Sequence, residues 1–178
     1  PPSGQQLRTA RGFLAPDGNA YVVGLGLKNH RIDHISGETG RVKASWKLKT
    51  GRHRAGVARI GEHAFVLVGA EDIDDPQSQQ TGERIDLVSG EHTLFPLPEK
   101  LSQIHAIMLP SGNVWVLAKA QSPYRTVQGL IDRDNRFREL SIPMPAIDIP
   151  THATLLHDGS IFVLSTSGDA LRFYPHGL

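Results

Sequence analysis

The chain has 178 residues, no cysteine and a formal net charge of +1 at pH 7, with 21% charged residues. Without cysteine it forms no disulfide and has no thiolate for catalysis or metal binding. A net charge this small gives no overall field that would attract nucleic acid or an anionic membrane, and the sequence has no apolar run of about 18 residues to span a bilayer.

An eight-residue phrase recurs four times along the chain. Each copy starts with a basic or imidazole side chain, continues with Gly or Ala, and ends at a turn glycine. The glycines lie 43, 51 and 47 residues apart, which indicates a repeated unit of several strands. The copies start at Arg11, Arg54, His105 and His152 and end at Gly18, Gly61, Gly112 and Gly159.

The phrases divide the chain into predicted units at roughly residues 8–50, 51–100, 101–149 and 150–178. In each unit the phrase predicts a first strand. An apolar run rich in β-branched and aromatic residues predicts a second strand, at residues 20–24, 64–69, 114–118 and 161–165. These runs do not alternate with polar residues, so both faces of the second strands must be covered.

The remaining strands of each unit are more polar. Two nearly identical segments, 31–38 and 84–91, predict third strands, with weaker matches at 130–133 and 170–174. Predicted fourth strands lie at 42–48, 93–97 and 137–142. Burial is therefore expected to fall steadily from the first strand to the fourth.

Residues 101–108 are ambiguous, because their apolar spacing also fits a helix. We predict a strand, since the phrase at His105 aligns with the three other copies.

The burial gradient is typical of a β-propeller, in which inner strands lie between neighbouring blades and outer strands meet water. A small residue follows the first position of each phrase, where strands would converge on the axis: Gly12, Ala55, Ala106 and Ala153. We therefore predict an all-β fold, with residues 1–178 forming one domain of about four blades, each of four antiparallel strands.

Several of these residues resemble the kelch repeat. That repeat has a basic or His residue near the start of its inner strand, a turn glycine, an aromatic and aliphatic second strand ending in glycines, a Tyr/Ile-Asp third strand and a Trp in the fourth. The double glycine is not intact in this chain, and later units lack the tryptophan. The matching residues are Arg54, Gly61, Phe65, Gly69 and Ile85-Asp86 in segment 52–98, and Tyr21, Gly24, Ile32-Asp33 and Trp46 in the first unit.

The fourth unit ends after its third predicted strand. Residues 5–10 could supply a fourth strand and close a four-bladed ring. The kelch resemblance implies six or seven blades, so the alternatives are part of a larger propeller or a ring assembled from two chains.

The leading side chains Arg11, Arg54, His105 and His152 are predicted to gather at one mouth of the channel. Guanidinium groups suit a carboxylate or phosphate, and imidazoles titrate near neutral pH. The alternative is that each of the four bonds the neighbouring blade and holds the ring together.

Two loops on the same face are further candidates for ligand binding. One is the acidic segment 71–82 with Asp72, Asp74 and Asp75, and the other is 121–128 with Tyr124 and Arg125. The acidic spacing lacks the glycine-bearing pattern of a calcium loop, so neither a metal nor a cofactor is predicted.

Three functions remain open. The first is a non-enzymatic module that recognises a protein or glycan through the loop-bearing face. The second, implied by resemblance to kelch-type sialic acid epimerases, is an enzyme acting on an anionic sugar, with His105 or His152 moving a proton. The third is an architectural segment of a larger assembly. Removal of a leader would place the protein in a secreted or periplasmic compartment.

Overall fold

The computed structural model describes residues 10–25, 30–70, 76–141 and 150–174 of the chain. The strands in these ranges form four antiparallel sheets, which we call blades 1 to 4. Within each sheet, strands that follow one another in the sequence are hydrogen-bonded neighbours. Blades 1 to 3 have four strands each, and blade 4 has three among the described residues.

The strands begin and end as follows. Blade 1 contains β1 (Ala10–Leu14), β2 (Ala20–Gly24), β3 (Arg31–Ile35) and β4 (Val42–Lys47). Blade 2 contains β5 (Gly56–Ile60), β6 (Ala64–Val68), β7 (Thr81–Asp86) and β8 (His92–Pro96), with a single-turn helix α1 (Pro76–Gln79) between β6 and β7. Blade 3 contains β9 (Leu101–Met108), β10 (Val114–Gln121), β11 (Tyr124–Ile131) and β12 (Phe137–Glu139). Blade 4 contains β13 (Pro150–Leu155), β14 (Ile161–Ser165) and β15 (Ala170–Phe173).

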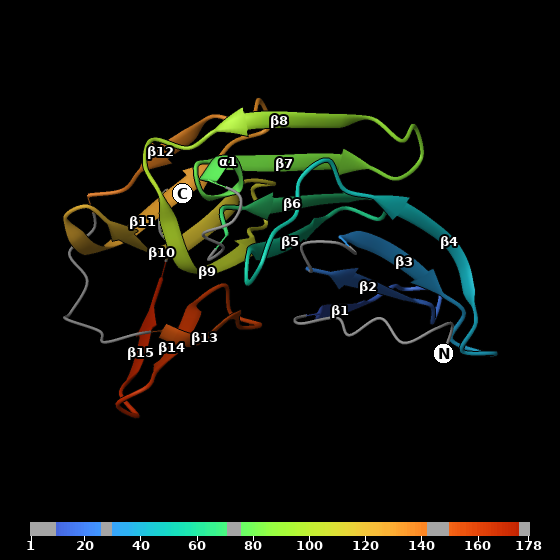
Figure 1. The fold of residues 1–178 in the computed structure, drawn as a ribbon. Helices are drawn as coiled ribbons and strands as arrows, with labels where there is room; N and C mark the ends of the chain where they lie inside the picture. Colours follow the sequence, from blue (N-terminus) through green and yellow to red (C-terminus); the bar gives the residue numbers. More distant parts are fainter. Residues whose placement is uncertain (1–9, 26–29, 71–75, 142–149, 175–178) are drawn as a thin grey trace.

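The four sheets fan out around a shared centre (Figure 1). Strands β1, β5, β9 and β13 lie innermost, and β4, β8 and β12 lie at the periphery. The chain is thus a four-bladed β-propeller, which confirms the predicted all-β fold class. Most of the predicted closing strand, residues 5–10, lies outside the described residues.

Residues 101–108 form strand β9, as the alignment of the phrases predicted. Strand β9 pairs with β10 from Leu101 to Met108, with one irregularity in register on the way. Tertiary pairing therefore decides a segment whose apolar spacing alone also fits a helix.

Burial does not fall steadily from the first strand, as the sequence had suggested, but peaks at the second. In blade 1, four of the five residues of β1 are exposed, whereas Tyr21 and Val23 of β2 are buried. Strands β6 and β10 lie between neighbouring sheets, and β2 and β14 each pack against one, while the first strands turn part of their surface to the central cavity.

The second strands of blades 2 and 3 each contribute to two apolar clusters. On β6, Phe65 and Leu67 pack toward blade 1, while Val66 and Val68 pack toward blade 3. On β10, even-numbered residues pack toward blade 2, and Trp115 and Leu117 pack toward blade 4. This explains why β6 is apolar at every position and β10 is apolar from Val114 to Ala118, since each fully buried large apolar side chain stabilises the fold by about 1.5–3 kcal/mol.

Each pair of consecutive blades is also joined by a side chain that donates to a backbone carbonyl. Arg59 of blade 2 donates to Leu14 O of blade 1 at 2.8 Å. Arg84 of blade 2 donates to the Asp132 carbonyl beyond β11 at 3.2 Å, and His105 of blade 3 donates to Pro150 O of blade 4 at 3.0 Å. These bonds fix the sheets relative to one another.

The nearly identical segments 31–38 and 84–91 occupy different positions in their blades. Arg31 is the first residue of β3, whereas Arg84 is the fourth residue of β7. Asp33 therefore lies inside a strand, while Asp86 ends its strand and accepts the N–H groups of Val88 and Ser89 in the following turn. The expectation that both segments are equivalent third strands is wrong in register.

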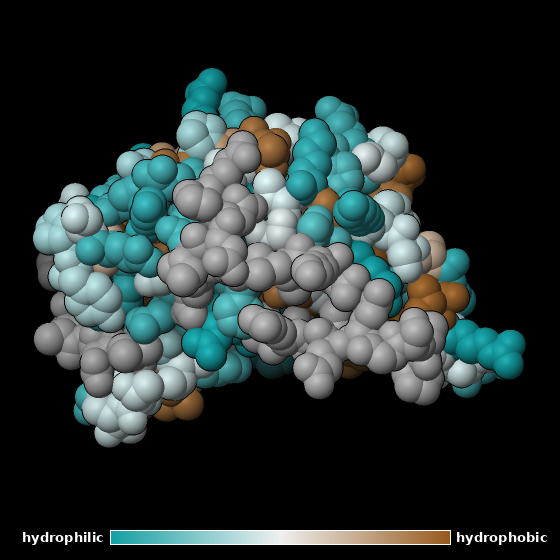
Figure 2. All heavy atoms as spheres, viewed as in Figure 1, coloured by the Kyte–Doolittle hydropathy of each residue, from teal (hydrophilic) through white to brown (hydrophobic). Residues whose placement is uncertain are grey.

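Exposed apolar side chains are scattered. On the face shown in Figure 2, hydrophobic residues appear as small patches separated by hydrophilic ones. The most exposed are Leu14 at 83% and Val88 at 76%, on different blades. In the described ranges no helix is long and apolar enough to cross a membrane.

Gly56 tests how closely blades 2 and 3 approach at the hub. A Cβ at this position would lie 2.5 Å from Ile104 Cγ2 and 3.2 Å from the Ala106 Cβ, so β9 would have to shift. We expect Gly56→Ala to lower the free energy of unfolding by about 1–3 kcal/mol, as overpacking of a core does. Urea denaturation followed by tryptophan fluorescence measures the change.

Gly12 provides the matched control, because within the described ranges no heavy atom beyond its two chain neighbours lies within 4 Å of a Cβ built there. We expect Gly12→Ala to leave the free energy of unfolding within about 0.5 kcal/mol of the original. Equal effects of the two substitutions would contradict the close approach of β5 and β9.

Candidate functional site

A cavity of about 340 Å³ lies where the four inner strands meet. Every blade contributes to its wall through β1, β5, β9 or β13. The lining residues are Arg11, Gly12, Phe13, Val57, Ile104, His105, Ala106, His152, Ala153 and Thr154. The cavity therefore contains three of the four side chains predicted to gather at the channel mouth.

The fourth predicted side chain, Arg54, is not part of the cavity wall, and Val57 takes its place. The hairpin between the first two strands spans residues 15–19, 109–113 and 156–160 in blades 1, 3 and 4, but only 61–63 in blade 2. Gly61 begins its short loop, whereas Gly18 is the fourth residue of its own. Counting seven residues back from the turn glycine therefore gives Arg54 in blade 2, three residues before Val57, which occupies the position of Arg11.

Arg54 instead lies before β5 in an exposed position, with a φ of 51°. The small residue that follows the leading side chain shifts in the same way. Ala58, not Ala55, occupies the place of Gly12 in blade 1. The requirement for a small side chain near the hub thus holds in blade 2, at a different residue from the one predicted.

His105 is held between blades 3 and 4. Its Nε2 donates to Pro150 O at 3.0 Å, which is the contact expected if the mouth residues hold the ring together. Burial lowers the pKa of His105 below its ordinary value of 6.5. The hydrogen bond to Pro150 opposes this shift, and the nearby charges of Arg11 and His152 add to it. The neutral ring with its proton on Nε2 is therefore the favoured form.

Arg11 and His152 are exposed, unlike His105, which is held by a hydrogen bond. Arg11 lies on β1 and His152 on β13. Within the described ranges, neither takes part in a hydrogen bond or ion pair. Among the described residues that line the cavity there is no carboxylate, so none of them neutralises the positive charge of Arg11.

Tyr124 and Arg125 lie at the tip of the β10–β11 hairpin, on the same face as the cavity. Ala120, near this tip, pairs with Leu101 at the start of β9. Tyr124 is 62% exposed, and the Lys119 ammonium lies 5.5 Å from the centre of its ring. Arg125 pairs with Glu139 at 2.5 Å and with Glu99 at 2.6 Å, which raises its pKa further. Arg125 is thus committed to internal contacts, while Tyr124 presents its ring to solvent.

The acidic loop residues Asp72, Asp74 and Asp75 lie outside the described residues. Elsewhere in the chain, the parts that the structure covers bring no three His, Asp or Glu side chains together as a metal site requires.

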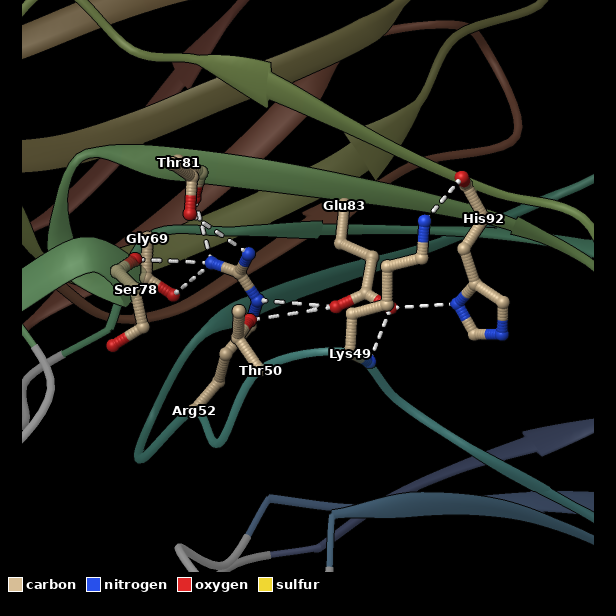
Figure 3. Close-up of polar contacts among 8 residues, drawn as sticks. All are labelled: Lys49, Thr50, Arg52, Gly69, Ser78, Thr81, Glu83 and His92. Atoms are coloured by element: carbon tan, nitrogen blue, oxygen red, sulfur yellow. Dashed lines mark hydrogen bonds and ion pairs between the residues drawn. The ribbon is translucent and has the colours of Figure 1, made fainter.

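A buried polar network that was not predicted from the sequence joins the connection between blades 1 and 2 to strand β7 (Figure 3). Arg52 and Glu83 are fully buried, and their charged groups lie 3.8 Å apart. Glu83 accepts hydrogen bonds from the Lys49 N–H at 2.8 Å and from His92 Nδ1 at 2.8 Å. Thr50 completes the set through its hydroxyl at 3.4 Å.

Arg52 also holds the base of the β6–β7 connection. Its Nη1 donates to the carbonyls of Gly69, Ser78 and Thr81, at 3.3, 3.0 and 2.6 Å. These carbonyls lie where the chain leaves and re-enters the sheet. The network therefore supports the scaffold under the loop that carries the acidic residues, and does not line the cavity.

Solved structures share this fold at low sequence identity. A hydrazine synthase from Kuenenia stuttgartiensis aligns with a TM-score of 0.63 and 15% identity, over 86% of this chain and 49% of its own. A nidogen/laminin complex aligns with a TM-score of 0.66 and 12% identity, over 92% of this chain and 59% of its own. BBS1N, in complex with ARL6DN, aligns with a TM-score of 0.54 and 12% identity, over 89% of this chain and 47% of its own.

The chain therefore spans about half the length of these structures, and at this identity the likeness concerns the fold alone. No protein-family model and no curated protein matches the sequence.

The buried pair of Arg52 and Glu83 can be tested by removing one partner. We expect Arg52→Ala to lower the free energy of unfolding by about 3–5 kcal/mol, because it leaves the Glu83 carboxylate buried without its cation. Chemical denaturation measures the loss. The control is Arg136→Ala, whose 78% exposed side chain lies 3.9 Å from Asp134 and should matter by less than about 0.5 kcal/mol. Similar losses of unfolding free energy in both variants would contradict a stabilising role of the buried network.

The lowered pKa of His105 predicts how stability depends on pH. Just below pH 6.5 the unfolded chain binds more protons at this residue than the folded chain does, so stability should fall as pH decreases from about 7.5. Replacing His105 by Gln keeps a donor for Pro150 O and removes the titration. We expect the difference in unfolding free energy between the original and His105→Gln to change between pH 7.5 and the lowered pKa. A difference that stays constant with pH would contradict the assignment.

Proposed function

We propose that the chain is a non-enzymatic recognition module. Its partner is a protein or glycan, bound on the face that carries the loops between the second and third strands. The observation that carries this proposal is the exposed Tyr124 at the tip of a rigid hairpin. Tyrosine offers a large contact surface with few rotatable bonds and is enriched among residues that dominate binding energy.

The surroundings of Tyr124 hold it ready for binding. Strands β9, β10 and β11 have eight residues each, whereas the corresponding strands of the other blades have four to six. Lys119 lies over the ring and also donates to Thr126 at 2.7 Å, while Arg125 links two acidic side chains. Because these groups are already ordered, binding at Tyr124 loses little conformational entropy.

We further propose that the units are divergent kelch repeats. Ile85-Asp86 ends β7, and Ile131 ends β11 with Asp132 directly after it. Each aspartate accepts two backbone N–H groups of the next turn. The nidogen/laminin structure supports a binding role by analogy, since a protein of this fold occurs there in a complex. Acidic residues Asp72, Asp74 and Asp75 would extend the recognition face.

The alternative of an enzyme acting on an anionic sugar draws support from His105 and His152, which share a cavity with Arg11. Its expected pair of arginines is not assembled in the cavity, since Arg54 lies outside the wall. The architectural alternative would place the faces of blades 1 and 4 against further blades or a second chain.

Tyr124 can be compared with a second exposed tyrosine. We expect Tyr124→Ala to weaken partner binding at least about 10-fold, a loss of about 1.4 kcal/mol, because the main exposed aromatic contact is removed. The full chain would be screened on a glycan array and against captured proteins, and affinities measured by surface plasmon resonance.

The control is Tyr174→Ala. Tyr174 is 48% exposed and bonds Asp158, beyond the end of β15 that lies opposite the loop-bearing face. Binding should survive this change. Equal losses in the two variants, or a loss only in Tyr174→Ala, would contradict recognition through the Tyr124 face.

A further inference from the structure

The central cavity has a chemical character that the recognition of a macromolecule at Tyr124 does not explain. The described part of its wall combines one guanidinium and two imidazoles with apolar side chains, and contains no carboxylate. Its volume of about 340 Å³ is at the lower end of the range of small-molecule sites, which is about 300–1,000 Å³. We propose that this cavity binds a small organic monocarboxylate, whose carboxyl group is held by Arg11.

Arg11 provides the charge for this site. Inside the described ranges it has no ion-pair partner. It lies on β1 next to Gly12, and both residues line the cavity. A guanidinium group presents paired N–H donors that match the two oxygens of a carboxylate. A ligand carboxylate would therefore supply a counter-charge that the described lining residues do not.

The basic side chains of the cavity come from three strands: Arg11 from β1, His105 from β9 and His152 from β13. Arg11 and His152 both act electrostatically on His105, which lies on the blade between them in the chain. The three side chains also line the same cavity, which places them around a common space. His105 is fixed by its bond to Pro150, so its ring forms a wall with a defined orientation.

The permanent charge favours a monocarboxylate over a phosphate group. Among the lining residues that the structure describes, Arg11 is the one arginine, and none is a lysine. A phosphate monoester carries about 1.5 to 2 negative charges at pH 7 and would require further cations. Val57 and Ile104 form apolar parts of the wall, against which the carbon skeleton of the ligand would lie.

The test is a titration of the full chain by NMR, followed through the ring protons of His105 and His152. The probes are benzoate, its neutral analogue benzamide, and inorganic phosphate. We expect benzoate to shift both signals in a saturable way, and benzamide and phosphate to bind at least about 10-fold more weakly.

Two variants separate this site from non-specific anion binding. Arg11→Gln should weaken benzoate binding at least 10-fold, which corresponds to about 1.4 kcal/mol. Arg54→Gln, which changes the arginine outside the cavity, should leave it unchanged. Equal losses in both variants, phosphate binding as tight as benzoate, or the absence of a saturable shift would overturn the proposal. A loss of partner binding in Tyr124→Ala has no bearing on this result, so the two proposals stand or fall separately.

Discussion

The structure depends on the packing of each sheet against the next. Strands β6 and β10 are covered on both faces, and successive residues such as Phe65 and Val66 enter different apolar clusters. A sheet in this position cannot move without opening two interfaces. The close packing also brings the first strands to one centre, so Arg11, His105 and His152 share a cavity without any direct attraction among them. The site is therefore a consequence of the blade packing.

Close packing also buries backbone carbonyl groups in the β6–β7 connection, and these need hydrogen-bond donors. The carbonyl groups of Gly69 and Thr81 lie at the ends of strands β6 and β7, and that of Ser78 lies in α1 between them. A buried carbonyl without a donor is destabilising. Arg52 supplies the donors, since a guanidinium has five N–H groups. Its burial in turn requires a carboxylate, and Glu83 provides it. The ion pair thus follows from the need to satisfy the backbone at the base of a long connection.

Patterns that span whole strands could be read from the sequence, whereas register could not. The apolar runs and the turn glycines predicted the blades, and aligning His105 with the other phrases identified β9 correctly. Arg54 was misplaced because the hairpin of residues 61–63 is shorter than its counterparts. Segments 31–38 and 84–91 have similar sequences, but the first begins at the first residue of β3 and the second at the fourth residue of β7. A short stretch of similar sequence does not reveal the length of the neighbouring loop, and that length sets the register of the paired strands.

The two proposed sites both involve blade 3, which raises the question of whether they communicate. His105 lies on β9, while Tyr124 begins β11. Coupling between sites requires an element with two alternative arrangements whose balance both ligands shift. Between these residues lies β10, seven of whose eight residues are buried and packed against both neighbouring blades. Such a close-packed strand resists alternative arrangements, so the channel ligand and the partner at Tyr124 should bind independently.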